Sequence, residues 1–545
     1  MPPYRSLVLQ TLALSLAAGA LSMALTGFFF GIGNNVFHIP YVLGLAQAPQ
    51  FAGDAFYQSL DKFTSIVWPL LRLVSTEANV EQVFFLAQCA SRVAAFAAVI
   101  VLARALGLVQ WMALALLCAV LALSPWMQLV SVVGGHGMLI PYFTHSELTW
   151  PLVFLLVAFL LRRQAVRAAA ACGVAFCVNA FVGLWLLWLA FVWGLLARPA
   201  LAPRRWALAA LAFALTALPA LAWVAWSVGS DPAAAFDYRA YIRSYYPEHF
   251  LIEAAPPSAL LALVALGASA WLAAQALPGR AALRHLLLGL LLLLLAGAAL
   301  PYVLNQRFVF NLHLLRAAGL LQALAVVLAA CASAARVLQG QDARLRLLGA
   351  ATLALLALGP ATAAMAWLLL ALLACAQLLE TGALPWPRLP PWCAAPAAWL
   401  PPLLLGGLLA SAGWQLQARA PRFPLLYDQE WVDMASWVRQ SDLRGVFLLP
   451  LHEPDAAYFQ LLARRPVWVE PKQGAAVMWQ PSFHAQWRRR MDEVQALESS
   501  PEALLAYARA QGIAHVLLAR GDGACPAGAR MVRAWPRHVL CASAP

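Results

Sequence analysis

Apolar residues along this chain come in blocks of about 20, separated by short polar connections. A helix of about that length crosses roughly 30 Å of hydrocarbon at 1.5 Å per residue. Apolar and polar residues do not alternate over ten-residue strands, so a helical bundle is favoured over a β-barrel. We predict about 13 membrane helices, over residues 7–30, 82–104, 108–131, 148–163, 166–178, 181–197, 206–228, 258–277, 282–303, 311–336, 346–360, 361–379 and 397–416.

The apolar stretch 166–197 is better divided than continuous. Undivided, it forms a helix about 48 Å long, which puts Arg162 and Arg163 on the opposite side of the membrane from Arg198. A break at Asn179 gives two short helices and brings these arginines to one side, as the positive-inside rule requires. Because each half is shorter than a full span, both halves should be buried among other helices.

The charges then indicate an orientation. Arginines gather in alternate connections: Arg104, Arg162, Arg163, Arg167, Arg198, Arg204, Arg205, Arg280 and Arg284. Acids gather in the others: Asp54, Asp61, Glu77, Glu81, Glu147, Asp237, Glu248 and Glu253. We therefore predict a multi-pass protein of a bacterial inner membrane, with the N-terminus cytoplasmic and the C-terminal end periplasmic. The first apolar run has no convincing cleavage site and is read as a retained helix.

Composition agrees with a membrane protein. The 545 residues are 63% hydrophobic and only 11% charged, which excludes a water-soluble protein. Positive-inside topology explains the net charge of +13 better than nucleic-acid binding does. Most cysteines lie in or beside apolar segments, where they pack as small residues. Cys525 and Cys541 lie in the polar tail, where an oxidising compartment permits a disulfide; the sequence leaves the pairing open.

The predicted fold is a mainly α polytopic membrane domain, residues 1–417, followed by a small α/β domain, residues 418–545. The tail pattern predicts helices over 430–440, 456–463, 484–497 and 501–511, strands over 446–451, 467–470 and 514–518, and a hairpin over 531–541. No glycine-rich loop follows a strand, so a nucleotide site is not expected. The long connections 31–81, 132–147 and 229–257 all fall on the outer face, where we expect the chemistry.

Two acids in these outer loops are candidates for chemistry. Asp54 follows Gly53 among aromatic residues and is either a general base or metal ligand, or a helix N-cap. Glu147 precedes the fourth helix and is either a second acid facing Asp54 or a carboxylate stabilised by the helix dipole. Asp54 and His145 are the possible ligands of a divalent metal, although the spacing matches no standard site, so the cofactor stays unknown.

Basic residues inside or near the membrane suggest a phosphate site. Arg92 lies in the middle of the second helix, where a charge costs about 2.5–3.5 kcal/mol, so it should point inward to an anionic partner. His313 and Arg316 share one helix face close to Arg307. This cluster suits a lipid phosphate, and snorkelling of interfacial residues explains it equally well.

Residues 238–250 are aromatic and charged, and either form an aromatic belt or a sugar-stacking surface with Arg243, Tyr246 and His249. Lysine occurs only at Lys62 and Lys472. Lys472, beside a predicted strand, either aims at the same groove or is a solvated loop residue.

Taken together, these features resemble the GT-C superfamily of integral-membrane glycosyltransferases, and in particular bacterial multi-pass members with a soluble C-terminal domain. The matching stretches are 38–56, 179–184, 246–250, 437–439, 447–450, 463–472 and 486–490. The resemblance implies a polyprenyl-phosphate sugar donor, an inverting transfer on the outer face and Asp54 as the loop acid. The chain departs from the expected histidines at Asn179 and at Glu248.

Our leading hypothesis is a glycosyltransferase that moves a sugar from a polyprenyl-phosphate donor to an acceptor. Asp54 is the predicted base, with Glu147 as a supporting acid. The residues predicted to neutralise the lipid phosphate are Arg316, His313, Arg92 and Arg307, and those predicted to bind sugar or acceptor are Arg243, Tyr246, His249 and Lys472. The alternatives are a carrier or flippase for a lipid-linked or small solute, and a non-catalytic scaffold in envelope glycan assembly.

Overall fold

The computed structural model describes residues 4–229, 235–340, 342–384, 399–419, 427–520 and 525–543, and it divides into two compact units. The membrane unit comprises Met1–Phe28, Phe85–Leu221 and Asp237–Arg422. The tail unit comprises Phe29–Phe84, Ala222–Phe236 and Phe423–Pro545. Each unit has its own hydrophobic core and is described by itself.

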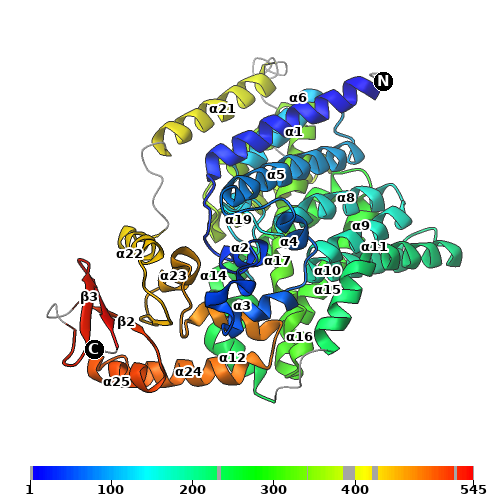
Figure 1. Ribbon diagram of the computed structural model, residues 1–545. Coiled ribbons are helices and arrows are strands. Elements are labelled where there is room, and N and C mark those ends of the chain that lie inside the picture. The colour runs from blue at the N-terminus through cyan, green and yellow to red at the C-terminus, as the bar shows by residue number, and fades with distance from the viewer. Residues whose placement is uncertain are drawn as a thin grey trace. The chain divides into compact units, whose positions relative to one another are not determined.

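Every predicted membrane span contains a helix (Figure 1). The helices are α1 (Tyr4–Thr26), α5 (Val80–Ala105), α6 (Trp111–Leu123), α8 (Trp150–Leu161), α9 (Ala165–Val178), α10 (Ala180–Leu196), α11 (Pro203–Gly229), α14 (Pro257–Gln275), α15 (Arg280–Val303), α17 (Ala318–Gln339), α18 (Ala343–Leu358), α19 (Ala363–Glu380) and α21 (Leu400–Arg419). Within the described ranges, seven helices are long and apolar enough to cross a membrane, and α6, α8, α9 and α10 are shorter apolar helices. The protein is a mainly α, multi-pass membrane protein with a small C-terminal sheet.

The break predicted at Asn179 is confirmed. Asn179 has an extended backbone (φ −147°, ψ 107°) between α9 and α10. Its Oδ1 accepts hydrogen bonds from the backbone N–H groups of Phe181 (3.1 Å) and Val182 (3.3 Å), so it is the N-cap of α10. The absence of a side chain at Gly183 lets α10 pack directly on the backbone of α9 at Phe176. The two short helices form a closely packed hairpin.

Helix α17 forms the core of the membrane unit and packs against α6, α14 and α18. Most of its residues are buried, and many of them are alanines, which allow neighbouring helices to approach closely. Near its C-terminal end, the Arg336 guanidinium makes two hydrogen bonds to the Glu380 carboxylate of α19 (2.8 and 3.1 Å). This pair satisfies a buried cation and joins α17 to α19.

The tail unit contains a four-stranded sheet in the order β1–β2–β4–β3, with β1 parallel to β2 and the other pairs antiparallel (Figure 1). Its elements are α22 (Gln429–Gln440), β1 (Phe447–Leu448), α23 (Ala456–Ala463), η8 (Pro471–Met478), α24 (Phe483–Leu497), α25 (Pro501–Ala510), β2 (His515–Ala519), β3 (Arg530–Ala534) and β4 (His538–Ala542). The predicted strand over 467–470 is wrong: Val467 makes a single bridge to Phe447. The chain then turns, because Glu470 caps η8 through a capping box.

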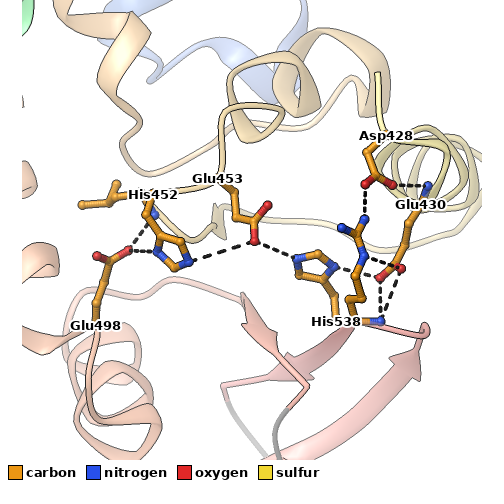
Figure 2. Close-up of polar contacts among 8 residues, drawn as sticks. Asp428, Glu430, His452, Glu453, Glu498 and His538 are labelled. Carbon is orange, nitrogen blue, oxygen red and sulfur yellow. Dashed lines mark hydrogen bonds and ion pairs between the residues drawn. The ribbon is translucent and has the colours of Figure 1, made fainter. Parts of the chain in front are cut away.

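Polar contacts fix the β3–β4 hairpin to α22 (Figure 2). His538 Nδ1 lies 2.8 Å from Glu430 Oε1, and Arg537 is paired with both Glu430 and Asp428. On the other side, His538 Nε2 lies 3.7 Å from Glu453 Oε1. Cys525 and Cys541 form a disulfide, so the pairing that the sequence left open is present.

The first predicted outer loop folds together with the tail. Its helices are α2 (Asn35–Val42), α3 (Ala55–Ser59) and α4 (Val67–Arg72). The Trp479 indole donates a hydrogen bond to Ser59 Oγ (3.0 Å) and packs edge-on against Phe37. Arg464 pairs with Glu77 at 3.0 Å. Sequence reasoning assigned residues 31–81 and 418–545 to separate domains and did not anticipate this association.

Candidate functional site

Asp54 lies at the N-terminus of α3 in the tail unit. Its Oδ1 accepts a hydrogen bond from the Tyr57 backbone N–H (2.9 Å), so the N-cap interpretation is confirmed. Its Oδ2 accepts a hydrogen bond from Gln460 Nε2 of α23 (2.5 Å). A further hydrogen bond from Gln473 Nε2 to Gln460 Oε1 (2.9 Å) fixes the orientation of the Gln460 amide. Both oxygens of Asp54 are therefore held in place by the surrounding fold.

The carboxylate of Asp54 also borders a cavity of about 170 Å³. Burial raises the pKa of Asp54 to about 6, although the hydrogen bonds from Tyr57 N and Gln460 favour the charged form. A carboxylate with a pKa near 6 is ionised at neutral pH and accepts a proton more readily than an exposed aspartate. Capping the helix and facing the cavity are compatible roles for this residue.

Lys472 lies in η8, next to Glu470. Glu470 is buried, and burial raises its pKa to about 7; its side chain accepts a hydrogen bond from the Lys472 backbone N–H (2.6 Å). The Lys472 side chain is half-buried, with Nζ 5.9 Å from the centre of the Phe37 ring, and burial lowers its pKa. Lys472 is therefore not the solvated loop lysine of the simpler interpretation.

In the membrane unit, Arg92 of α5 has the anionic partner that was predicted for it. Its Nη2 lies 3.4 Å from Glu147 Oε1, and both side chains are 1% exposed. The same Nη2 donates a hydrogen bond to the Ile140 carbonyl (2.5 Å). The pair joins α5 to the segment before α8. Because neither side chain reaches a surface, the pair is inaccessible to a substrate in this structure, and the predicted catalytic role of Glu147 and phosphate role of Arg92 stay predictions.

Arg316 lies in the 3-10 turn η6 (Leu314–Ala317), against the loop that contains Gly134 and Gly135. Gly134 has φ +76°, and a Cβ there would lie 2.6 Å from the Leu315 carbonyl oxygen, so only glycine allows this approach. The Arg316 guanidinium points to the Gly135 carbonyl oxygen (Nη2 to O, 3.4 Å). Its Nε is buried and has no hydrogen-bond partner in the part of the chain that the structure describes.

Histidines surround this arginine; we call His136, His145, His249, His313 and Arg316 the Arg316 cluster. Burial and the charge of Arg316 lower the pKa of His136 and of His145 to about 3, so both imidazoles are neutral. His249 Nδ1 lies 3.1 Å from the Gly134 carbonyl oxygen, which holds its ring beside the loop. The cluster thus places one guanidinium among imidazoles, of which His136 and His145 are neutral and can donate hydrogen bonds.

An apolar groove of about 610 Å³ runs between α14 and α15. It is lined by Ile252, Leu260, Leu263, Val264, Gly267, Ala268, Trp271, Leu287, Leu288, Leu291, Leu294, Leu295, Ala298, Leu315 and Leu321. Leu315, which lines this groove, precedes Arg316 in the chain, so the backbone of Arg316 lies beside the groove wall. A lipid phosphate needs an apolar surface for its chain and a cation for its phosphate, and the groove and Arg316 offer one each.

The other predicted residues lie elsewhere. Arg243 pairs with Glu253 at 3.1 Å, and both are exposed. Tyr246 connects α12 (Tyr238–Tyr245) to α13 (Pro247–Phe250), and Arg307 begins α16 (Arg307–Asn311) beside Tyr238. Over the described ranges, no group of three or more His, Cys, Asp or Glu side chains is arranged to hold a metal ion. Of the two possible metal ligands, Asp54 belongs to the tail unit and His145 to the membrane unit.

Sequence reasoning missed Gln460, Trp468 and Arg490, which border or support the Asp54 cavity. These residues lie more than 400 positions after Asp54 along the chain. The only signal was the 463–472 and 486–490 stretches quoted for the resemblance, which contain Trp468 and Arg490.

No family model and no curated protein matches the chain. Among solved structures, the chain is similar to the mycobacterial arabinofuranosyltransferase AftD, seen by cryo-electron microscopy, with 15% sequence identity and a TM-score of 0.42. The alignment covers 98% of this chain but only 40% of AftD. An overlap of this quality carries no weight for substrate or mechanism, which the residues of this chain must supply.

Proposed function

We propose that this protein is a glycosyltransferase of the inner membrane that transfers a sugar from a polyprenyl-phosphate donor to an acceptor hydroxyl on the periplasmic face. The main support is the apolar groove between α14 and α15, whose lining includes Leu315, the residue before Arg316. A polyprenyl chain would occupy the groove and its phosphate would meet the guanidinium. The Nε of Arg316, which has no hydrogen-bond partner among the described residues, and the neutral His136 and His145 would supply hydrogen-bond donors for the phosphate oxygens.

Asp54 is the proposed general base. The acceptor hydroxyl oxygen forms a bond to the anomeric carbon while the bond from that carbon to the phosphate oxygen breaks, and the electron pair of that bond stays on the phosphate. The hydroxyl proton passes to the Asp54 carboxylate and then to solvent. In the membrane unit, Arg316 is the residue proposed to neutralise the lipid phosphate, and preorganised positive charge of this kind is usually the largest contribution to stabilising a leaving phosphate.

Lipid analysis of a deletion strain tests this function. We expect the strain to accumulate one polyprenyl-phosphate sugar. Mass spectrometry of its lipids would detect this molecule and identify the donor. Wild-type protein should clear this lipid, whereas Asp54→Asn and Arg316→Ala should not, with an expected loss of about 10²–10³ in rate for the removed charge. Asp61→Asn, in the same loop as Asp54, and Arg284→Ala, at the start of α15, are matched controls that should clear it.

All four variants are checked for folding by size-exclusion chromatography. A strain without any accumulating lipid-linked sugar would contradict the proposed function, and so would full clearance by a folded Asp54→Asn protein. If the protein is a carrier and not an enzyme, the lipid in the deletion strain should stay on the cytoplasmic leaflet with its sugar intact.

A further inference from the structure

The cavity at Asp54 has the lining of a small polar binding site. Its wall is formed by Gln50, Gly53, Asp54, Ala55, Phe56, Val446, Pro466, Val467, Trp468, Gln473, Phe483 and Arg490. Its volume of about 170 Å³ equals that of about five or six water molecules at 30 Å³ each. The space is therefore large enough for one sugar ring.

An acid and a guanidinium line this cavity. Each acts on the other's charge through space, but in the described part of the chain they do not form a direct ion pair. The Arg490 guanidinium lies over the Trp468 ring, with its carbon 3.7 Å from the ring centre, and its Nη1 donates a hydrogen bond to the Trp468 carbonyl (3.0 Å). The Arg490 Nε is buried without a hydrogen-bond partner among the residues that the structure describes. Asp54 is held instead by Tyr57 N and Gln460. The two charged groups are thus fixed separately, one as acceptor and one as donor.

This combination matches the chemistry of a sugar. Each sugar hydroxyl both donates and accepts, so a ring can donate to Asp54 and accept from Arg490 at the same time. The apolar side chains of Phe56, Val467 and Phe483 offer a surface to the C–H groups of the ring. An anion would be repelled by Asp54 and a simple cation by Arg490, so a neutral polyol is favoured over either ion.

We infer that the Asp54 cavity binds a single neutral sugar ring of the acceptor, with one ring hydroxyl on Asp54 and another on Arg490. This inference rests on the proposed function and adds the chemical class of the acceptor. The Gln473–Gln460–Asp54 hydrogen-bond chain fixes the carboxylate before the sugar arrives, which reduces the entropy lost on binding.

Saturation-transfer NMR with methyl glycosides tests the inference on the full chain in lipid nanodiscs, where no sugar detergent competes. We expect at least one of the methyl glycosides of glucose, galactose, mannose and arabinose to bind with millimolar affinity. Arg490→Met removes the guanidinium and should weaken binding about ten-fold or more. Arg489→Met, which alters the exposed neighbour of Arg490, should bind as wild type.

A second variant tests the cavity without removing a polar group. Gly53 borders the cavity, and a Cβ there would meet no atom within 4 Å, so Gly53→Leu should fold normally, narrow the cavity and weaken sugar binding. The inference is overturned if no glycoside binds to the wild type, or if both Arg490→Met and Gly53→Leu bind like it. Arg316→Ala should retain sugar binding while losing transfer. Lipid accumulation in the deletion strain together with absent sugar binding would overturn this inference alone.

Discussion

At the scale of single residues, the carboxylate of Asp54 depends on the amide of Gln460. A donor to the ionised form lowers the pKa of an acid, so removing that donor raises it. If Asp54 is the base, the transfer rate falls as the pH drops through its pKa, near 6 in the wild type. A hydrogen bond to a charged group contributes about 1.5–3 kcal/mol, and one pKa unit corresponds to 1.36 kcal/mol.

Gln460→Leu should therefore move the acid limb of the transfer rate to higher pH by about one unit or more. The pH profile of transfer in membranes measures this shift. Gln429→Leu, at an exposed position of α22, is the control and should leave the limb in place. A limb that does not move in Gln460→Leu would argue against Asp54 as the group whose ionisation is observed.

The buried pair of Arg92 and Glu147 leads to a second prediction at this scale. Arg92→Met leaves the Glu147 carboxylate uncompensated in a dry site and should cost about 3–5 kcal/mol of stability. The double variant Arg92→Met/Glu147→Leu removes both charges and should return close to the wild-type melting temperature. Fluorescence-detected size exclusion after heating measures all three proteins.

The transfer rate of the double variant tests separately whether Glu147 has a role in catalysis. If it is stable and still active, the supporting catalytic role predicted for Glu147 is contradicted. If instead the double variant is as unstable as Arg92→Met, the pair contributes more than charge compensation, and the lost hydrogen bond from Arg92 to the Ile140 carbonyl would be the cause.

Single residues also show how far the sequence could be interpreted. An anionic partner for Arg92 could be predicted because a charge in the middle of a membrane helix must be compensated, whatever the fold. The helix start at Asp54 could be predicted because Gly-Asp before a helical pattern is a local signal. Gln460 and Arg490 carry no such local signal. Their roles arise only when α23 and α24 fold against the first loop, and hydropathy does not report that contact.

At the scale of elements, the α9–α10 hairpin depends on Gly183. A Cβ at this position would lie 2.4 Å from the Phe176 backbone, which cannot move as a side chain could. Gly183→Ala should therefore destabilise the membrane unit by about 1–3 kcal/mol, the usual cost of overpacking. Gly406→Ala in α21 is the matched control, because a Cβ there meets open space.

The control should be neutral or slightly stabilising, since alanine favours a helix over glycine by about 0.8–1.0 kcal/mol. Melting temperatures of the two variants in the same detergent make the comparison. Equal melting temperatures would mean that α9 and α10 separate more easily than their packing indicates.

Most of the membrane helices could be predicted because a span of apolar residues has little choice of structure in lipid. The break at Asn179 was found from charge balance and not from hydropathy. The tail strands were harder: residues 467–470 have a strand-like composition, but Glu470 and Pro471 begin a 3-10 helix and end the pairing after one bridge. Elements of four residues are decided by their caps and neighbours, which a periodic pattern does not contain.

At the scale of the whole molecule, the tail unit is assembled from three separate stretches of the chain. A reading that proceeds from one end to the other assigns residues 31–81 to the membrane domain, because they lie between two membrane helices. Ion pairs between Glu77 and the two arginines Arg464 and Arg439 show why this fails. The partners lie more than 350 positions apart, and no local pattern links them.

The disulfide of the tail can test the proposed orientation of the molecule in the membrane. Cys525 and Cys541 are 16 positions apart, and closing a loop of that size contributes about 3 kcal/mol to stability. Such a bond persists in the periplasm but is reduced in the cytoplasm.

Cys541→Ser frees Cys525, which is partly exposed, whereas Cys525→Ser frees only the buried Cys541. A membrane-impermeant maleimide added to intact cells with a permeable outer membrane should therefore label Cys541→Ser strongly, and Cys525→Ser and wild type only at background. If Cys541→Ser is labelled only after the inner membrane is lysed, the tail lies in the cytoplasm. The disulfide would then be reduced, and the tail could not meet a periplasmic acceptor.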